Sequence, residues 1–376
     1  MRLMILIFLF CCCHYLSNAQ DVNAYAQTDK KEIRLSRLTV DSTRDIADYV
    51  KAHYDNEREK ARVIYEWVIA NLKYDTDSAR IINAGIDPYA KINVALKRRR
   101  GVCENFAAIF NDICSRAGLA SVVIDGYTKQ SGRVDRMGHS WCAVSINKDW
   151  YLFDPTWDVG NNMNLKFFMV DPAEFIESHM PFDPLWQFLN YPITHEQFYR
   201  GNTFKIDQTP YFNFSDSVTA YMEMDSLHKF QSAALRIQKY GLINTRVKEN
   251  YSVIKMNIEM QQQDKQLEWY NASMASLNEV AAILNKFIEY RNNQFIPEKS
   301  DSELSTLLDG IDERIESSQK NLDEVDKSEA KLVLGTEPVR ERIQSLLKKI
   351  QEQKDFLKRY LNTPAAERKS LFIEQN

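Results

Sequence analysis

One cysteine of this chain stands where a thiol could be activated as a nucleophile. Cys103 comes two residues after Gly101 and begins an apolar helical pattern that extends to Ala117. The N–H groups in the first turn of a helix lack partners within the helix, and together with the helix dipole they favour a thiolate there. The same N–H groups can hold an oxyanion that forms on a substrate carbonyl. We therefore predict that Cys103 is a nucleophile at the start of a helix.

A histidine and an aspartate further along the chain could complete this chemistry. His139 stands at the start of the predicted strand Ser140–Ile146, and Asp154 directly follows the predicted strand Trp150–Phe153. If the two strands pair as a hairpin, Asp154 returns to the level of His139 and can orient its ring. An imidazole in that position accepts the proton of a thiol and later returns it to a leaving group. Together with Cys103, these residues predict a catalytic triad.

Each member of this triad also has a structural interpretation when it is taken alone. A single cysteine in an apolar helix usually belongs to the core, and we interpret Cys114 in this way, with Cys142 packed in a strand. A single histidine is more often a surface or core residue than a catalyst, and an aspartate before a proline is common in plain turns. The order of helix-start cysteine, strand-start histidine and strand-end aspartate favours the catalytic interpretation.

Other chemistries find little support in the sequence. Cys103, Cys114 and Cys142 show no paired short spacing, and no two histidines stand four residues apart, so we expect no metal site. The chain has only 11 glycines and lacks a phosphate-cradling loop, so we expect no nucleotide cofactor. Its 48 basic and 52 acidic residues give a formal net charge of −4, which argues against nucleic acid as the main partner.

The first residues are typical of a secretory signal peptide. Arg2 precedes an apolar stretch from Leu3 to Cys13, and Ser17 and Ala19 occupy the small-residue positions of a cleavage site. The stretch is shorter than the roughly 20 residues of a membrane-spanning helix. We expect cleavage after residue 19 and export to the periplasm or the cell exterior, with no later membrane span. A lipid anchor on one of the cysteines at 11–13 is the alternative.

The elements that must position the triad are helices followed by strands. Apolar residues recur at helical spacing in three segments, and the period then changes to two. We predict a polar loop over Lys129–Met137 and a hairpin turn at Asn147-Lys148-Asp149. The predicted helices are Glu57–Tyr74, Ile92–Arg99 and Cys103–Ala117, and the predicted strands are Ala120–Tyr127, Ser140–Ile146 and Trp150–Phe153.

Beyond about residue 200 the sequence is charged and helical. Three apolar repeats alternate spacings of three and four, from Leu267 to Ile288, from Leu308 to Val325 and from Val339 to Tyr360, with polar gaps at Ser318 and Gln353. This pattern predicts coiled-coil-like helices that fold back on one another or pair with another chain. We divide the chain into a signal peptide (1–19), a catalytic domain (20–200) and a helical domain (201–376).

The catalytic domain contains five short motifs: Tyr65-Glu66-Trp67-Val68, Lys73-Tyr74-Asp75, Arg100-Gly101-Val102-Cys103, Gly138-His139-Ser140-Trp141 and Phe153-Asp154-Pro155-Thr156-Trp157. Over roughly residues 57–157 this set resembles the transglutaminase-like superfamily of papain-type cysteine enzymes, with the bacterial and kyphoscoliosis-peptidase-like branches nearest. Two positions depart from the family pattern. Asn105 stands where members often have glycine, and Cys142 stands where they often have a polar residue.

The resemblance implies an α+β fold in which the cysteine helix packs on an antiparallel sheet that carries the other two triad residues. It implies that Cys103 is the nucleophile, His139 the general base and acid, and Asp154 the orienting carboxylate. It also makes Tyr74 a candidate second donor of the oxyanion hole and Trp157 a candidate residue of the substrate cleft. The alternative for Tyr74 is a core tyrosine at a helix end.

We therefore expect an exported cysteine hydrolase or acyltransferase that acts on peptide or isopeptide amides without a cofactor. The thiolate would attack an amide carbonyl and release an amine, and the thioester would be resolved by water or by another amine, with hydrolysis as the first choice. The rival hypothesis is a non-catalytic transglutaminase-like scaffold whose helical half binds a protein partner or a second copy.

Overall fold

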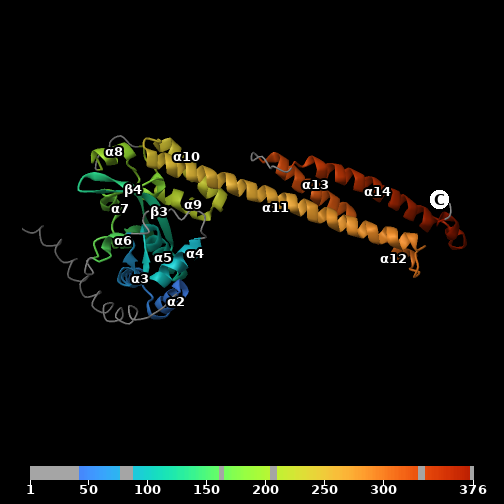
Figure 1. Cartoon of the computed structure of the whole chain (residues 1–376), viewed down its shortest axis with the longest axis horizontal. Coiled ribbons are helices and arrows are strands. Elements are labelled where there is room, and N and C mark those ends of the chain that lie inside the picture. The colour runs from blue at the N-terminus through green and yellow to red at the C-terminus, as the bar shows by residue number, and fades with distance from the viewer. Residues whose placement is uncertain (1–41, 77–87, 161–164, 204–209, 329–334, 373–376) are drawn as a thin grey trace, which may run out of the picture. The chain divides into compact units, whose positions relative to one another are not determined.

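The computed structural model describes residues 42–76, 88–160, 165–203, 210–328 and 335–372 (Figure 1). The chain divides into two compact units. The first, unit 1, runs to Met224 and also includes Ser232–Tyr251, and the second, unit 2, comprises Asp225–Gln231 and Ser252–Asn376. The predicted signal peptide lies outside the described residues.

Among the described residues, four helices open unit 1, and the first two begin where a side chain caps the helix start. For example, the side chain of Asn56 accepts hydrogen bonds from the N–H groups of Arg58 and Glu59, which fixes the start of the second of these helices. The last helix begins at Cys103, as predicted, and ends before Gly118, whose φ of 88° suits a glycine. The four helices are α2 (Thr43–His53), α3 (Glu57–Asn71), α4 (Pro88–Arg98) and α5 (Cys103–Arg116).

The helix predicted over Glu57–Tyr74 is shorter in the structure, because its last residues form a strand. α3 ends at Asn71, and β1 (Lys73–Tyr74) pairs in parallel with β2 (Arg100–Gly101). The partner strand is distant in sequence, so the local apolar spacing could not reveal this pairing. Its consequence is that Tyr74 lies beside Gly101, two residues before the candidate nucleophile.

A four-stranded antiparallel sheet follows the helices, with the strand order β5-β4-β3-β6. In the β4–β5 hairpin Cys142 lies opposite Phe153, and in the β3–β6 pair Gly126 lies opposite Pro181. The antiparallel pairing of these strands confirms the predicted α+β class with an antiparallel sheet. The strands are β3 (Ser121–Gln130), β4 (Arg133–Ile146), β5 (Asp149–Phe153) and β6 (His179–Pro181).

The polar loop predicted over Lys129–Met137 is in fact the tip of a long hairpin. β3 continues to Gln130 and β4 begins at Arg133, so the turn consists of Ser131 and Gly132, both with positive φ. The tip of a hairpin is exposed to water on both faces, so its strands need no alternation of apolar and polar residues. The polar composition of this segment therefore resembled that of a loop. His139 consequently lies within β4 and not at the start of a strand.

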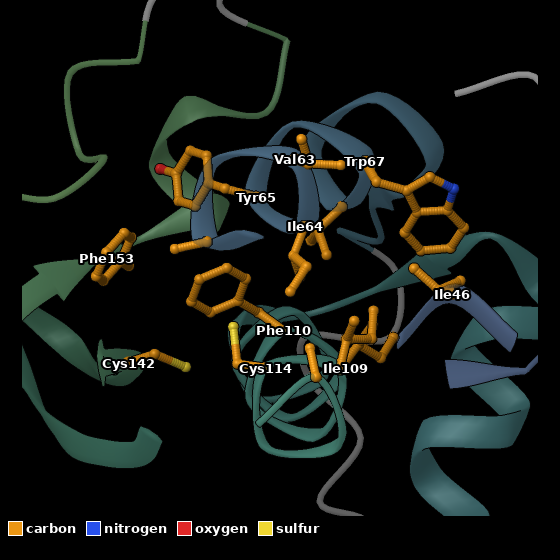
Figure 2. Packing of buried hydrophobic residues seen from close by; sticks show 14 of the residues in the cluster. Ile46, Val63, Ile64, Tyr65, Trp67, Ile109, Phe110, Cys114, Cys142 and Phe153 are labelled. Carbon is orange, nitrogen blue, oxygen red and sulfur yellow. The ribbon is translucent and has the colours of Figure 1, made fainter. Parts of the chain in front are cut away.

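Successive residues of the sheet point into two separate cores, as the period of two requires. Cys142 of β4 and Phe153 of β5 belong to the core under α2 to α5, where Figure 2 shows them on the side of the sheet that faces Phe110 and Cys114 of α5. Trp141, the neighbour of Cys142, belongs to the core on the other face. The sheet is therefore covered on both sides. The predicted core packing of Cys114 in its helix and of Cys142 in its strand agrees with the complete burial of both residues.

Short elements cover the second face of the sheet. Asp183 is buried, and its carboxylate accepts a two-point contact from the guanidinium of Arg236 at 2.8 and 2.6 Å, which attaches the end of unit 1 to this face. These elements are α7 (Pro172–Phe175), the 3₁₀ turn η2 (Pro184–Gln187), α8 (His195–Arg200), α9 (Phe214–Glu223) and α10 (Ser226–Tyr240). The short helix α6 (Pro155–Asp158) packs instead against α3 and α5.

Unit 2 is built from long helices that lie side by side (Figure 1). The long C-terminal helical region that the sequence predicted is confirmed. Its core includes apolar positions of all three predicted repeats, together with residues at other positions, such as Val280, Phe287 and Phe295. At the start of the first repeat Leu267 is 45% exposed, while its neighbour Gln266 is buried. The elements are α11 (Thr245–Asn292), α12 (Asp301–Ser305), α13 (Ile311–Lys327), α14 (Glu337–Asn362) and η3 (Ala365–Phe372), and α11 enters unit 2 at Ser252.

Both polar gaps of the repeats are buried and find polar partners. The hydroxyl of Ser318 lies 2.7 Å from that of Ser273, and the side-chain oxygen of Gln353 accepts a hydrogen bond from Arg291 at 2.7 Å. Among the described residues, no helix combines the length and the apolar composition that crossing a bilayer requires.

Candidate active site

Cys103 is the first residue of α5, and the chain around it is built for a close approach. A Cβ atom on Gly101 would lie 2.6 Å from the Cβ atom of Asn105, so a side chain at this position would collide with the first turn of the helix. The residue before Cys103 is Val102, which makes no side-chain cap to the helix. The N–H group of Asn105 donates to the backbone oxygen of Val102 at 2.9 Å, so the first-turn N–H groups of Cys103 and Glu104 are the ones placed for a ligand at the thiol.

Asn105 explains one departure from the family pattern. Its side-chain oxygen accepts a hydrogen bond from the N–H group of Val102 at 3.0 Å. The side chain thus reaches back over the helix start and fixes the peptide that precedes Cys103. A glycine at this position could not do so, and in this chain the asparagine holds the turn that leads into Cys103.

His139 and Asp154 lie in direct contact. The Nε2 atom of His139 is 2.7 Å from Oδ2 of Asp154, and the aspartate is completely buried. The other carboxylate oxygen, Oδ1, accepts the N–H groups of Thr156 at 2.9 Å and Trp157 at 3.4 Å, because Asp154 is the N-cap of α6. Since Nε2 faces the aspartate, Nδ1 is the ring nitrogen left for Cys103.

The electrostatics of this pair favour an imidazolium beside a carboxylate. Burial opposes the charge on His139, but the charge and the hydrogen bond of Asp154, followed by the hydrogen bond and charge of Cys103, raise its pKa to about 10. Burial likewise opposes the charge on Asp154, yet the contacts with His139 and His179 hold its pKa well below the usual value. A protonated histidine held by a buried carboxylate is the partner that a cysteine–histidine ion pair requires.

A second histidine on the same carboxylate was missed by the sequence analysis. His179 of β6 is completely buried, and its Nε2 atom lies 3.2 Å from Oδ2 of Asp154. Its Nδ1 atom lies 2.8 Å from the hydroxyl of Ser178. In sequence His179 is a single histidine two residues before Pro181, so no spacing pattern marks it.

The cleft at Cys103 has a volume of about 430 Å³. Tyr74 and Trp157, both named from the sequence as cleft candidates, line it together with Cys103 and His139. Tyr74 is 38% exposed, so it is not the core tyrosine of the alternative interpretation. A neighbouring hollow of about 750 Å³ shares a wall with the cleft at Gln130, Thr156 and Trp157, so an extended ligand could occupy both.

The motif residues around the triad have structural partners. Asp75 is buried and makes ion pairs with Arg98 at 3.2 Å and Arg100 at 3.7 Å, which holds β1 and therefore Tyr74 beside the helix start. The hydroxyl of Tyr65 lies 2.9 Å from the backbone oxygen of Asp154, under the triad. The motifs thus supply both the residues of the candidate site and the contacts that support them.

The described residues that could hold a metal are His139, Asp154 and His179. Within the part of the chain that the structure describes, His139, Asp154 and His179 form a set whose ligand atoms all lie within 4.8 Å of one another. Both imidazole Nε2 atoms, however, already lie at hydrogen-bonding distance from the same carboxylate oxygen. Hydrogen bonding accounts for the arrangement, and the metal-free interpretation of the sequence stays a prediction.

Known proteins resemble the first half of the chain. Residues 44–155 match the transglutaminase-like superfamily, a segment that contains Cys103, His139 and Asp154. Human kyphoscoliosis peptidase is 30% identical over 191 residues, which cover 46% of this chain and 28% of the relative. Hillarin of Drosophila melanogaster is 25% identical over 205 residues, which cover 46% of this chain and 24% of the relative.

The chain thus spans about a quarter of the length of these curated relatives. A crystal structure of a TGase covers 42% of this chain at 17% identity, with a TM-score of 0.25. The match to the family includes the helices and strands that carry the cleft, and it ends before β6 and His179. Residues 44–155 therefore belong to the transglutaminase-like superfamily, which confirms the family that the sequence motifs indicated.

Proposed function

We propose that this protein is a cysteine hydrolase or acyltransferase for peptide or isopeptide amide bonds. The observation that carries the proposal is the 2.7 Å contact of His139 with the buried Asp154, in a cleft that also exposes Cys103 at the start of α5. The superfamily match and the similarity to a kyphoscoliosis peptidase support a reaction of this class.

In the proposed reaction Cys103 is the nucleophile, and His139 transfers protons. The thiol proton of Cys103 resides on His139, and the thiolate sulfur attacks the amide carbonyl carbon to form a C–S bond. The oxyanion accepts hydrogen bonds from the first-turn N–H groups of α5 and from the hydroxyl of Tyr74. Burial and the charges of Cys103 and Asp154 raise the pKa of Tyr74. Its hydroxyl therefore stays protonated and can donate a hydrogen bond to the oxyanion.

Collapse of this intermediate breaks the C–N bond. His139 gives its proton to the departing amine, and the acyl group remains on Cys103 as a thioester. Water or a second amine then loses a proton to His139 and attacks the thioester, which restores the thiolate and the imidazolium. Asp154 holds the ring of His139 in one orientation through both halves of the reaction. Water gives hydrolysis, our first choice, and an amine gives transfer.

The first test needs no substrate. Iodoacetamide is added to the full chain between pH 4 and pH 9, and mass spectrometry follows the alkylation of each cysteine separately. We expect Cys103 to react fast already at pH 5, and His139→Ala to slow it there by about 100-fold. Cys114 and Cys142 are internal controls, because burial raises the pKa of both thiols and both are completely buried.

The same experiment decides between the enzyme and its rival. A scaffold that merely retains the fold would show Cys103 reacting no faster at pH 5 than a thiol without a partner, with no response to His139→Ala. If the fast reaction is present, a mixture of peptides with and without an isopeptide bond is the next substrate, with Cys103→Ser as the inactive control. Cleavage or transfer that survives Cys103→Ser would contradict the mechanism.

We further propose that the protein acts after export. The proposal rests on Arg2, the apolar stretch from Leu3 to Cys13 and the small residues before position 20. Fractionation of producing cells, followed by sequencing of the protein's N-terminus, tests it. A mature chain that begins near Gln20 outside the cytoplasm is expected, and an intact Met1 in the cytoplasm would contradict it.

A further inference from the structure

The carboxylate of Asp154 accepts more hydrogen bonds than the orientation of one catalytic histidine requires. Its Oδ1 atom accepts two backbone N–H groups, and its Oδ2 atom is shared by the Nε2 atoms of His139 at 2.7 Å and His179 at 3.2 Å. Both distances lie within the range of an N–H···O hydrogen bond. The side chains of Asp154 and His179 are both completely inaccessible to solvent.

The chemistry of the carboxylate fixes the tautomer of His179. An ionised carboxylate can only accept, so the Nε2 atom of His179 must carry a hydrogen. A neutral imidazole has one such hydrogen, so Nδ1 is then an acceptor and takes the hydroxyl hydrogen of Ser178 at 2.8 Å. The same hydroxyl lies 3.4 Å from the backbone oxygen of Phe175, so the contact with His179 is the shorter of these two. The result is a directed chain in which Ser178 donates to His179, and His179 donates to Asp154.

We propose that His179 is a positioning residue of the active site: it holds the carboxylate of Asp154 in place, uncharged itself, and so fixes the ring of His139 against Cys103. This inference rests on the proposed function, because a carboxylate that orients a catalytic histidine is what His179 would serve. It adds to the triad a residue outside the segment that matches the superfamily.

The two histidines contact the same carboxylate oxygen, but their different surroundings favour different charge states. Burial is the main cause that lowers the pKa of His179 to about 4, whereas the pKa of His139 is raised to about 10. The charged or titratable groups that act on His179 are Asp154, His139 and Asp135. A neutral His179 leaves the full charge of Asp154 for the imidazolium of His139; a charged His179 would compete for it.

Aromatic rings hold His179 in this state. Its ring stacks on Phe175 with 3.9 Å between the centroids, and the rings of Trp157 and Trp141 lie at 4.4 and 5.2 Å. β6 reaches this position because β3 has Gly126 opposite it, where a Cβ atom would lie 2.2 Å from the backbone oxygen of Met180. The enclosure removes water from Asp154 and strengthens the hydrogen bonds that it accepts.

The first experiment reads the tautomer of His179 directly. The full chain is labelled with ¹⁵N in its histidines, and long-range proton–nitrogen spectra are recorded from pH 5 to pH 9. We expect both buried histidines with lowered pKa values, His179 and His195, to stay neutral throughout this range. The signals that vanish in His179→Gln belong to His179 and should show its hydrogen on Nε2. A proton on Nδ1 of His179, or a charged ring at pH 6, would overturn the proposal.

The second experiment measures Cys103 alkylation by iodoacetamide in two variants. His179→Phe keeps the ring and removes the donor, whereas His179→Gln keeps an N–H donor of similar reach. We expect His179→Phe to slow the reaction at pH 5 by about tenfold and to leave the rate at pH 9 unchanged, as moving an ionisation by about one pH unit would. His179→Gln should restore most of the rate.

The outcomes separate this proposal from the proposed function. A purely structural histidine would lower the melting temperature in both variants without changing the ratio of the rates at pH 5 and pH 9, and that result overturns the positioning role. If wild-type Cys103 shows no fast reaction at pH 5, the proposed function fails, while the ¹⁵N spectra still decide whether His179 is the neutral donor to Asp154. Those spectra also hold should His179→Phe fail to fold.

Discussion

The two units bury polar groups of different kinds. Among the described residues, unit 1 buries seven aspartate, glutamate or histidine side chains, whereas the buried polar side chains of unit 2 are serines and glutamines. The set in unit 1 is Glu66, Asp75, Asp154, Asp158, His179, Asp183 and His195, and the set in unit 2 is Gln266, Ser273, Ser318 and Gln353. Burying a charge costs far more than burying a hydroxyl or an amide, so unit 1 needs a reason that unit 2 lacks.

The reason is found at the cleft. Asp154 and His179 meet at the candidate triad, and Asp75 anchors the strand that carries Tyr74. Each of these groups has specific partners that offset its burial. In unit 2 the polar gaps only interrupt an apolar repeat, which suits a unit whose task is to pack. Among the described residues, the buried carboxylates and histidines thus belong to the unit with the candidate site, where some meet at the cleft and others, such as Asp183, form ion pairs away from it.

The largest expected effect comes from neutralising the carboxylate of the triad. Asp154→Asn removes the charge that stabilises the imidazolium and places an amide group where two imidazole donors converge. We expect Cys103 alkylation at pH 5 to fall by up to about 100-fold, as we expect when His139 itself is removed. The measurement is the iodoacetamide assay with cysteine-resolved mass spectrometry.

Asp183→Asn is the matched control for that variant. Asp183 is also buried and also paired, through Arg236, but it does not line the cleft. It should lower the stability of unit 1 and leave the Cys103 rate within about twofold. Equal losses of reactivity in the two variants would show that buried charge in unit 1 serves folding alone.

A cavity in unit 2 should have the opposite signature. Leu322 is completely buried between the long helices, and Leu322→Ala should lower the free energy of unfolding of unit 2 by about 3 kcal/mol. Pulse proteolysis with mass spectrometry assigns the loss to fragments of unit 2, and Leu347→Ala, which alters a 39% exposed side chain, is the control. An accompanying loss of Cys103 reactivity would mean that the units do not work independently.

The sequence could predict the triad candidates because each stands at a boundary or in a motif of an element with a clear pattern. Cys103 begins an apolar helix, and Asp154 ends a strand with a simple alternation. The fold class followed from the same patterns together with the family resemblance. In unit 2 the apolar repeats predicted the long helices for the same reason, since one local periodicity extends over many turns.

Interactions between distant segments could not be predicted in this way. His179 reaches Asp154 only because β6 pairs with β3, and Tyr74 leaves its helix only because a distant strand pairs with it. Asn105 read as a departure from the family, and its hydrogen bond to Val102 became clear only from the turn that Gly101 permits. Leu267 fits its repeat but is exposed, since periodicity does not say where a covering helix ends.

The pH dependence of stability should also differ between the units. The pKa of His139 is raised to about 10, so its contribution is complete below about pH 6.5 and is lost as the pH rises towards 10. The pKa values of His179 and His195 are lowered to about 4, chiefly by burial. Unfolding therefore takes up protons between pH 6.5 and pH 4, and stability falls in that interval as well.

Unit 1 should consequently be most stable near pH 6.5. We expect its melting temperature to fall by roughly 5 °C between pH 6.5 and pH 5. Tryptophan fluorescence can follow this, because Trp269 is the single tryptophan of unit 2 and the other five belong to unit 1. His228, the described histidine of unit 2, is exposed, so proteolysis of unit 2 fragments should show a weaker dependence. A flat profile for unit 1 would contradict the assignment of neutral buried histidines.

The smallest expected effect tests whether neutral polarity in unit 2 is architectural. Ser273 and Ser318 pair their hydroxyls at 2.7 Å in the core, so Ser318→Ala alone leaves a buried hydroxyl without its partner and should cost about 1–2 kcal/mol. The double variant with Ser273→Ala removes both hydroxyls, and it should be close to the wild type in stability. Urea unfolding followed by proteolysis of unit 2 fragments measures both. If the double variant is instead the least stable, the pair contributes net stability, and the distinction between the units rests on charge alone.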